Sequence, residues 1–139
     1  MASEVLTSTG NLLRKATQQW RARWSTSVAN GMTSPQFVVL SLLTPGEPLD
    51  QHDISERAVL DKASCSYLVD RLVKLGFVHA TEDPADRRRK LVEITPTGRR
   101  AFQDAKPGHV EAHRATLVNL TEPEQDQLNR LLRKMLDTR

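Results

Sequence analysis

Cysteine, aromatic residues and long apolar runs are scarce in this sequence, and each scarcity removes a class of protein. The chain has one cysteine, Cys65, so it forms no internal disulfide and offers no cysteine cluster for zinc. It has no apolar run of about 18 residues and no basic N-terminal start followed by an apolar stretch. We therefore expect neither a membrane span nor a secretory signal, and a cytoplasmic protein.

Sequence motifs of catalysis are also missing. We find no nucleophile elbow, phosphate-binding loop or paired acid–base arrangement, so the sequence predicts no enzyme, no cofactor and no metal. His109 and His113 stand at a spacing that can bind a metal, but no cysteine or carboxylate pair joins them. A helix surface or a dimer-facing side is the alternative that we favour for this pair.

The composition favours several long helices around a small core. Hydrophobic residues make up 38% of the 139 residues and aromatic residues 4%. A chain of this length forms one domain, residues 1–139. Long helices that carry one apolar stripe often bury it against a second subunit, so we expect a homodimer.

Positive charge is concentrated in the middle of the chain. Residues 62–91 contain seven lysines and arginines against four acidic residues, which accounts for the whole net charge of +3. Nucleic acid is the first partner that such a segment indicates. A solvated surface is the plain alternative, because most charge runs are only that.

Apolar residues at spacings of three and four predict two helices in the first third of the chain. The first covers residues 4–29, with Gly31 ending it. The second begins with Ser34 as its cap and Pro35 in its first turn, and it stops before the next proline, Pro45.

Two further helices precede the basic tip. Asp50 can cap a short helix over residues 51–58, and another opens at Asp61 or Lys62 and ends at Gly76. Two short helices with a tight connection, the second amphipathic and partly cationic, fit a helix-turn-helix.

A β-hairpin follows these helices. One strand begins at residues 77–79, the other covers residues 91–94, and residues 83–86 have the chemistry of a turn. Four cations crowd its tip, namely Arg87, Arg88, Arg89 and Lys90.

Two helices complete the chain. Thr95 and Pro96 begin one that runs to about residue 117 or 119, and Pro107-Gly108 predicts a kink or a break within it. Thr121 then opens a capping box for the last helix.

Several stretches together resemble the MarR-type winged helix-turn-helix transcription regulators. Residues 32–40 are similar to the opening of the family's second helix, and residues 68–72 with 76–78 to the end of its recognition helix. Residues 83–88 and 92–98 are similar to its wing and the exit from it.

The resemblance implies an architecture and a function. The fold would be mostly α with a small β-hairpin wing, with residues 32–98 as the DNA-binding winged unit and residues 1–31 and 99–139 as dimerisation helices. The molecule would be a homodimer that binds pseudo-palindromic double-stranded DNA, usually as a repressor. Release would follow binding of a small aromatic or phenolic effector, or cysteine oxidation.

The resemblance also implies roles for residues on the helices. Ser34 and Gln36 would meet phosphate at a helix N-terminus. Family members often carry Thr-Arg where this chain has Ser66-Tyr67, which removes one basic contact. The residues that would face the major groove lie at the start of the recognition helix and are Lys62, Ala63, Ser64, Ser66 and Tyr67.

In the wing, one of Arg87, Arg88 and Arg89 would enter the minor groove, and Arg88 matches the family's wing arginine best. Asp86 would orient an arginine. Asp70 and Arg71 would contact DNA or, as we favour, form a salt bridge that holds the recognition helix to the wing.

Three readings stay open beside these. Cys65 lies near the start of the recognition helix, where a helix N-terminus and Lys62 favour a redox-active thiolate, although a small packing residue is the commoner role. A ligand pocket lined by Trp20, Trp24 and His113 would lie between the dimer helices and the winged unit, unless the tryptophans only pack in the core. A winged-helix module that binds a protein partner and does not read DNA is the alternative function.

Overall fold

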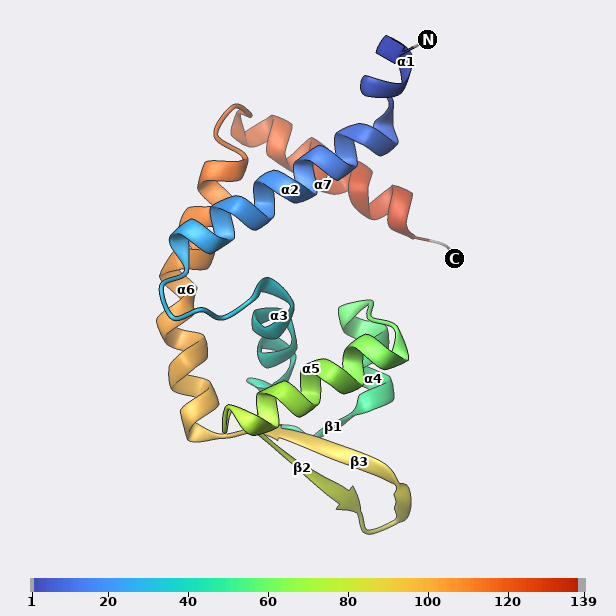
Figure 1. The fold of residues 1–139 in the computed structure, drawn as a ribbon, viewed down its shortest axis with the longest axis vertical. Helices are drawn as coiled ribbons and strands as arrows, with labels where there is room; N and C mark the ends of the chain where they lie inside the picture. The colour runs from blue at the N-terminus through green and yellow to red at the C-terminus, as the bar shows by residue number, and fades with distance from the viewer. Residues whose placement is uncertain (1, 138–139) are drawn as a thin grey trace.

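Long helices and a winged unit occupy opposite ends of the molecule in the computed structural model, which describes residues 2–137 (Figure 1). The mostly α fold with a β-hairpin wing is as predicted. None of the described helices has the combination of length and apolarity that a bilayer span requires. In chain order the elements are α1 Ala2–Leu6, α2 Thr9–Ser27, α3 Ser34–Leu43, β1 Leu49–Asp50, α4 Gln51–Ala58, α5 Lys62–Lys74, β2 Val78–Asp83, β3 Asp86–Ile94, α6 Pro96–Thr116 and α7 Glu122–Leu136.

Hydroxyl and carboxylate side chains begin the helices of the winged unit. We predicted Ser34 as the cap of α3, but the cap is Thr33. The Thr33 hydroxyl accepts a hydrogen bond from the Gln36 N–H, and the Gln36 side chain accepts one from the Thr33 N–H. The predicted caps of α4, α6 and α7 are confirmed, and they are Asp50, Thr95 and Thr121.

The first helix is divided in two, which the sequence did not predict. α1 ends at Leu6, and the Ser8 hydroxyl caps α2 by accepting a hydrogen bond from the Asn11 N–H at 3.4 Å. The same hydroxyl donates to the Val5 carbonyl at 2.7 Å. Serine side chains bond readily to nearby backbone and so compete with a continuous helix. At its other end, α2 stops at Ser27, two residues before the predicted limit.

Helix α6 continues through Pro107, so a break at this point was the wrong expectation. A proline inside a helix costs one backbone hydrogen bond, which is why the sequence indicated an interruption. Close packing on α2 outweighs this cost. A Cβ atom on Gly108 would lie 2.5 Å from the Ser27 carbonyl oxygen, so the glycine lets the two backbones approach where the helices meet.

Three antiparallel strands form the wing, in the order β1-β3-β2. β1 pairs Leu49 with Val92 and Asp50 with Leu91, and a strand of two residues was too short to predict. The hairpin turns between Asp83 and Asp86, as expected. The four cations of residues 87–90 lie along β3 and not in the turn itself, which corrects our placement.

The core of the winged unit lies where α3, α4, α5 and β3 meet. Leu40, Ile54, Leu72 and Val92 come one from each of these elements, and all four are fully buried. Because these four side chains are buried in one core, α5 and the wing are held rigidly relative to each other.

An aromatic cluster joins this unit to the long helices. Phe37 of α3 stacks on Phe102 of α6, with ring centroids 4.5 Å apart, and Trp24 of α2 meets Phe37 edge-on at 5.3 Å. The ring of His109, on α6, also stacks on Phe37, with the two ring centroids 4.7 Å apart. His113 is exposed and lies outside the rings of this cluster, although its ring centroid is 6.3 Å from that of His109.

His109 has an unusual environment for a titratable group. Its Nδ1 atom is buried and has no hydrogen-bond partner among the described residues 2–137. Burial first, and then the charge of His113, lower the pKa of His109 below its usual value. Within residues 2–137, no group of three or more histidines, cysteines and carboxylates could hold a metal ion.

Gly108 provides a test of the contact between α2 and α6. We expect Gly108→Ala to lower the free energy of unfolding by about 1–3 kcal/mol, because the added methyl group has to displace the backbone of α2. Denaturant unfolding at neutral pH measures the change. Gln103→Ala, at an exposed position on the same helix, is the control and should stay within about 0.5 kcal/mol of the parent. An equally stable Gly108→Ala variant would contradict the close contact.

His109 gives a second prediction, on pH. Its folded-state pKa lies below the unfolded value of about 6.5, so its contribution to stability is present above that pH and is lost as the pH falls through the folded-state pKa. His109→Phe keeps an aromatic ring and removes the titration. The free energy of unfolding, measured between about pH 7.5 and pH 5, should fall less steeply in this variant than in the parent. His79→Gln, at an exposed position on β2, should leave the parent slope unchanged.

Candidate nucleic-acid interface

The exposed face of α5 presents small, hydroxylated and cationic side chains. Its buried side is fixed by Cys65, Val69 and Leu72, which pack into the core. Asp61 caps the helix by accepting a hydrogen bond from the Ser64 N–H at 2.7 Å, and the Ser64 hydroxyl donates to the same carboxylate at 2.9 Å. The predicted contact residues on this helix are exposed except for the half-buried Ser66, and they are Lys62, Ala63, Ser64, Ser66, Tyr67 and Arg71.

The turn between α4 and α5 is strained at Val59. This residue ends α4 with φ +54° and ψ +57°, in the left-handed region that β-branched residues rarely adopt. Its side chain is 88% exposed, so packing does not account for the choice of valine. The conformation reverses the chain sharply enough to lay α5 across α4.

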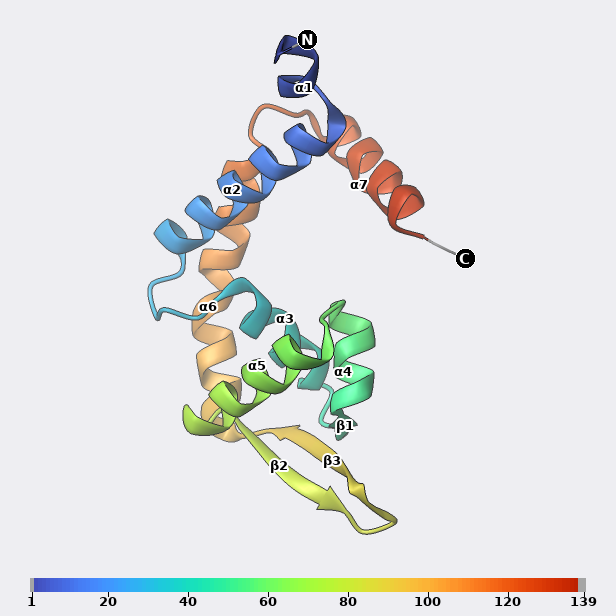
Figure 2. The same ribbon diagram turned by 45° about the vertical axis from the view of Figure 1, so that its right-hand side comes forward.

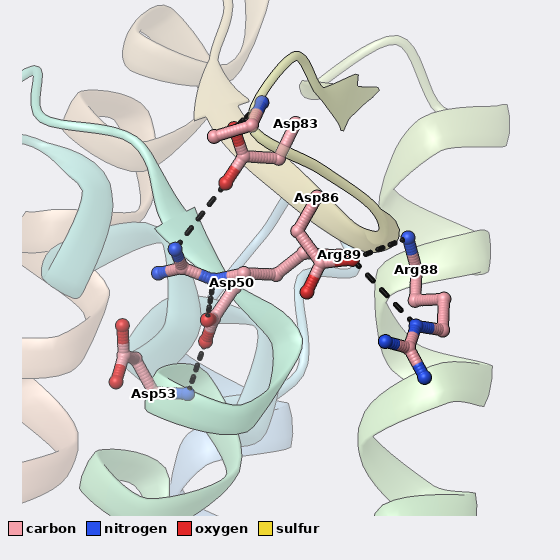
Figure 3. Close-up of polar contacts among 7 residues, drawn as sticks. Asp50, Asp53, Asp83, Asp86, Arg88 and Arg89 are labelled. Atoms are coloured by element: carbon pink, nitrogen blue, oxygen red, sulfur yellow. Dashed lines mark hydrogen bonds and ion pairs between the residues drawn. The ribbon is translucent and has the colours of Figure 1, made fainter.

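Arg88 is the wing arginine that pairs with Asp86. Its side chain is 96% exposed and lies beside Asp86, on the side away from Asp50 (Figure 3). The Arg88 N–H donates to an oxygen of Asp86 at 3.0 Å, and its Nε lies 3.8 Å from the same carboxylate. Asp86 therefore orients this arginine, as predicted. Arg87 is also exposed.

Arg89 is not free, in contrast to our expectation for the hairpin tip. Its guanidinium pairs with Asp50 and with Asp83, both of which are buried (Figure 3). The carboxylates come from β1 and from the end of β2, so a local pattern of basic residues did not reveal the pairing.

A cleft of about 390 Å³ brings the recognition helix and the wing together. Lys62 and Ser66 line it from α5, while Arg88 and Lys90 line it from β3. Residues that stand more than twenty positions apart in the sequence thus face one space, with an excess of cations. Such a cleft suits a phosphate backbone.

Ser34 and Gln36 are occupied inside the protein. The Ser34 hydroxyl accepts a hydrogen bond from Trp20 Nε1 at 3.3 Å, and Gln36 completes the capping box of Thr33. Gln36 also lines a second cleft of about 740 Å³ with Tyr67 and Arg71 of α5. Gln36 therefore lies close to the predicted interface, whereas Ser34 does not line this cleft.

Among the described residues, neither Asp70 nor Arg71 forms the salt bridge to the wing that we favoured. Both are exposed on α5, and no salt bridge involving either is present in the described part of the chain. Asp70 lies in the cleft beside the wing and Arg71 in the second cleft, so they face different spaces.

Cys65 behaves as a packing residue. Its side chain is 1% exposed, and its thiol lies 3.5 Å from the Gln51 carbonyl oxygen. A redox sensor needs a thiolate that oxidants can reach, and this site does not offer that access.

An apolar pocket of about 580 Å³ lies beside α2. Trp20 and Trp24 line it, as predicted, whereas His113 does not. Arg21 lies at the same pocket and was missed, although a cation next to Trp20 on a helix was a visible signal. The other side is formed by residues 31–35, the segment that leads into α3. The pocket thus borders both the long helices and the winged unit.

Apolar side chains remain exposed on the long helices. No side chain of α7 is buried, and its apolar residues Leu131 and Met135 are about half exposed. Leu12 and Leu13 of α2 are similarly exposed. In Figure 2 the ribbon of α7 lies apart from that of the winged unit.

Comparison with known sequences gives a consistent result. The sequence model of the MarR family matches residues 30–89, from the loop before α3 to the wing arginines. The Escherichia coli transcriptional regulator HosA is 31% identical over 91% of this chain and 93% of its own length. The HTH-type transcriptional repressor NicR of Pseudomonas putida is 31% identical over 97% of this chain and 86% of its own.

The fold supports the same grouping. A solved structure of BpsR from Bordetella bronchiseptica, whose DNA binding is regulated by 6-hydroxynicotinic acid, matches with a TM-score of 0.90 and 30% identity over 96% of each chain. Because these similarities extend over nearly the whole length, the chain belongs to the MarR family of winged helix-turn-helix transcriptional regulators.

Proposed function

We propose that this protein is a homodimeric repressor that binds a pseudo-palindromic operator in double-stranded DNA. The observation that carries the proposal is the cleft in which the recognition helix and Arg88 lie side by side. In this arrangement α5 enters the major groove while the wing reaches the adjacent minor groove. The similarity to the repressor NicR supports repression as the outcome. Neither a catalytic step nor a cofactor is required.

The dimer part of the proposal rests on the long helices. Four large apolar side chains are exposed in the single chain, namely Leu12 and Leu13 of α2 and Leu131 and Met135 of α7. A second copy related by a two-fold axis buries such stripes and repeats the DNA-binding unit. Two recognition helices about 34–36 Å apart then match successive major grooves on one side of a duplex.

DNA binding gives a direct test. Selection of bound duplexes from a random pool should recover an inverted repeat, with half-sites about one helical turn apart. On that operator, Arg87→Ala combined with Arg88→Ala should make the salt dependence of binding less steep. Each lost phosphate contact reduces the slope of log K against log salt by about 0.9.

Arg14→Ala is the matched control, because Arg14 is exposed on α2, outside the winged unit. It should leave the salt slope as in the parent. If the double wing variant binds as tightly as the parent at every salt concentration, the wing does not contact DNA. If the pool yields no preferred duplex, the protein-binding alternative gains support.

We further propose that a small aromatic carboxylic acid binds beside α2 and releases the DNA. The pocket offers two indole rings for stacking, and Arg21 for a carboxylate. An occupant contacts α2 on one side and residues 31–35 on the other, so it biases how the winged unit is held relative to the dimer helices. The regulation of BpsR by 6-hydroxynicotinic acid supports this chemical class.

Tryptophan fluorescence reports on this site directly, because the only two tryptophans of the chain, Trp20 and Trp24, both line the pocket. Titration with 6-hydroxynicotinic acid or benzoic acid should change the emission in a saturable way and lower operator affinity. Arg21→Gln should weaken ligand binding by about tenfold or more, since it removes a charge-assisted hydrogen bond. Arg23→Gln, exposed on α2 but outside the pocket, should bind as the parent does. Equal affinity in both variants would count against Arg21 as the carboxylate partner.

A further inference from the structure

We infer that Arg89 is a positioning residue that latches the wing to the helix-turn-helix unit, and that it does not itself contact DNA. The inference rests on the proposed DNA-binding function and explains how the neighbouring Arg88 is aimed.

Arg89 connects separate segments of the chain (Figure 3). Its Nε donates to Asp50 Oδ2, and its Nη1 donates to Asp83 Oδ2 at 3.2 Å. Asp50 also caps α4, accepting from the Asp53 N–H at 2.7 Å, while Asp83 accepts from the Ala85 N–H at 2.9 Å in the turn of the wing. One guanidinium thus ties the tip of the wing to the start of α4.

Both carboxylates need this cation because they are buried. Asp50 is 8% exposed and Asp83 9%. An ionised carboxylate in such a place is strongly disfavoured unless hydrogen bonds and an opposite charge compensate it. The backbone N–H of Asp53 first, and then Arg89, lower the pKa of Asp50 below its usual value despite its burial. Asp50 is therefore charged at neutral pH, and the pairing with Arg89 is ionic.

The latch extends a short attachment. β1 and β3 form only two residue pairs, Leu49 with Val92 and Asp50 with Leu91. Arg89 lies two residues beyond the last pair, on the side of the tip. Its ion pairs therefore hold the part of β3 that the sheet leaves without support from β1.

The latch has a consequence for Arg88. Successive side chains of a strand point in opposite directions. With Arg89 drawn toward the two aspartates, Arg88 is directed away from them, toward solvent (Figure 3). A side chain held in this way loses less conformational entropy when it binds.

Arginine suits this position better than lysine does. Two nitrogens of one planar guanidinium reach two carboxylates at the same time, whereas lysine offers one compact ammonium group. Arg89→Lys thus keeps the charge that a phosphate contact needs and removes the bridge.

Asp83→Asn is the decisive substitution. Asparagine preserves the local turn bond to the Ala85 N–H and removes only the charge that Arg89 neutralises. We expect Asp83→Asn and Arg89→Lys each to weaken operator binding roughly tenfold, as the loss of one groove contact does. The double variant should be no weaker than either single one, because both break the same link.

Simple electrostatics predicts the reverse for Asp83→Asn, since removing a negative charge near DNA strengthens binding. Glu82→Gln is the matched control, because Glu82 is an exposed carboxylate next to Asp83 and outside the latch. It should bind DNA as tightly as the parent or more tightly. If Asp83→Asn also tightens binding and Arg89→Lys keeps it, Arg89 contacts phosphate and the latch is refuted.

Amide hydrogen exchange tests the latch without DNA. In Asp83→Asn and Arg89→Lys, the amides of residues 86–92 should exchange faster, while those of α6 stay protected. Glu82→Gln should leave both regions unchanged. Unchanged exchange in the first two variants overturns the latch. A parent protein that binds no duplex refutes the proposed function instead, and the exchange result still decides the role of Arg89.

Discussion

The close approach of α6 to α2 at Gly108 is the contact that joins the winged unit to the long helices. A side chain at this position would clash with the backbone of α2, so the close approach requires glycine. Through this contact the helix that leaves the wing is anchored on the other long helices. Any change in the crossing of α2 and α6 has to move the winged unit relative to the long helices, because packed cores deform little.

The aromatic cluster and the apolar pocket lie at the same junction. Trp24 belongs to both, and Trp20 links the pocket to the start of α3 through its hydrogen bond to Ser34. Under the proposed function, a ligand in this pocket would act where the two ends are joined, and it would need no long pathway to reach the recognition helix. His109 also lies at this junction, where burial lowers its pKa below the usual value.

Charge in the wing is divided between two tasks. Arg88 extends into solvent beside the recognition helix, where a duplex can meet it. Arg89 neutralises buried carboxylates and shapes the strand that carries Arg88. A count of basic residues treats these arginines as equivalent, whereas Arg89 is engaged in ion pairs with two buried carboxylates and Arg88 is not.

Local patterns in the sequence were sufficient for the main helices, the hairpin and the caps at Asp50 and Thr95, because a cap is defined within a few residues. They did not predict β1 or the division between α1 and α2. The cap of α3 is Thr33, one residue before the predicted Ser34, so such patterns place a helix end only to within about one residue. What tertiary structure decided depends on distant partners. Pro107 stays within a helix because α2 packs on Gly108, and Arg89 is bound because Asp50, 39 positions away, is brought beside it. A sequence pattern contains the residues of such a pair but not their distance, and only folding supplies that distance.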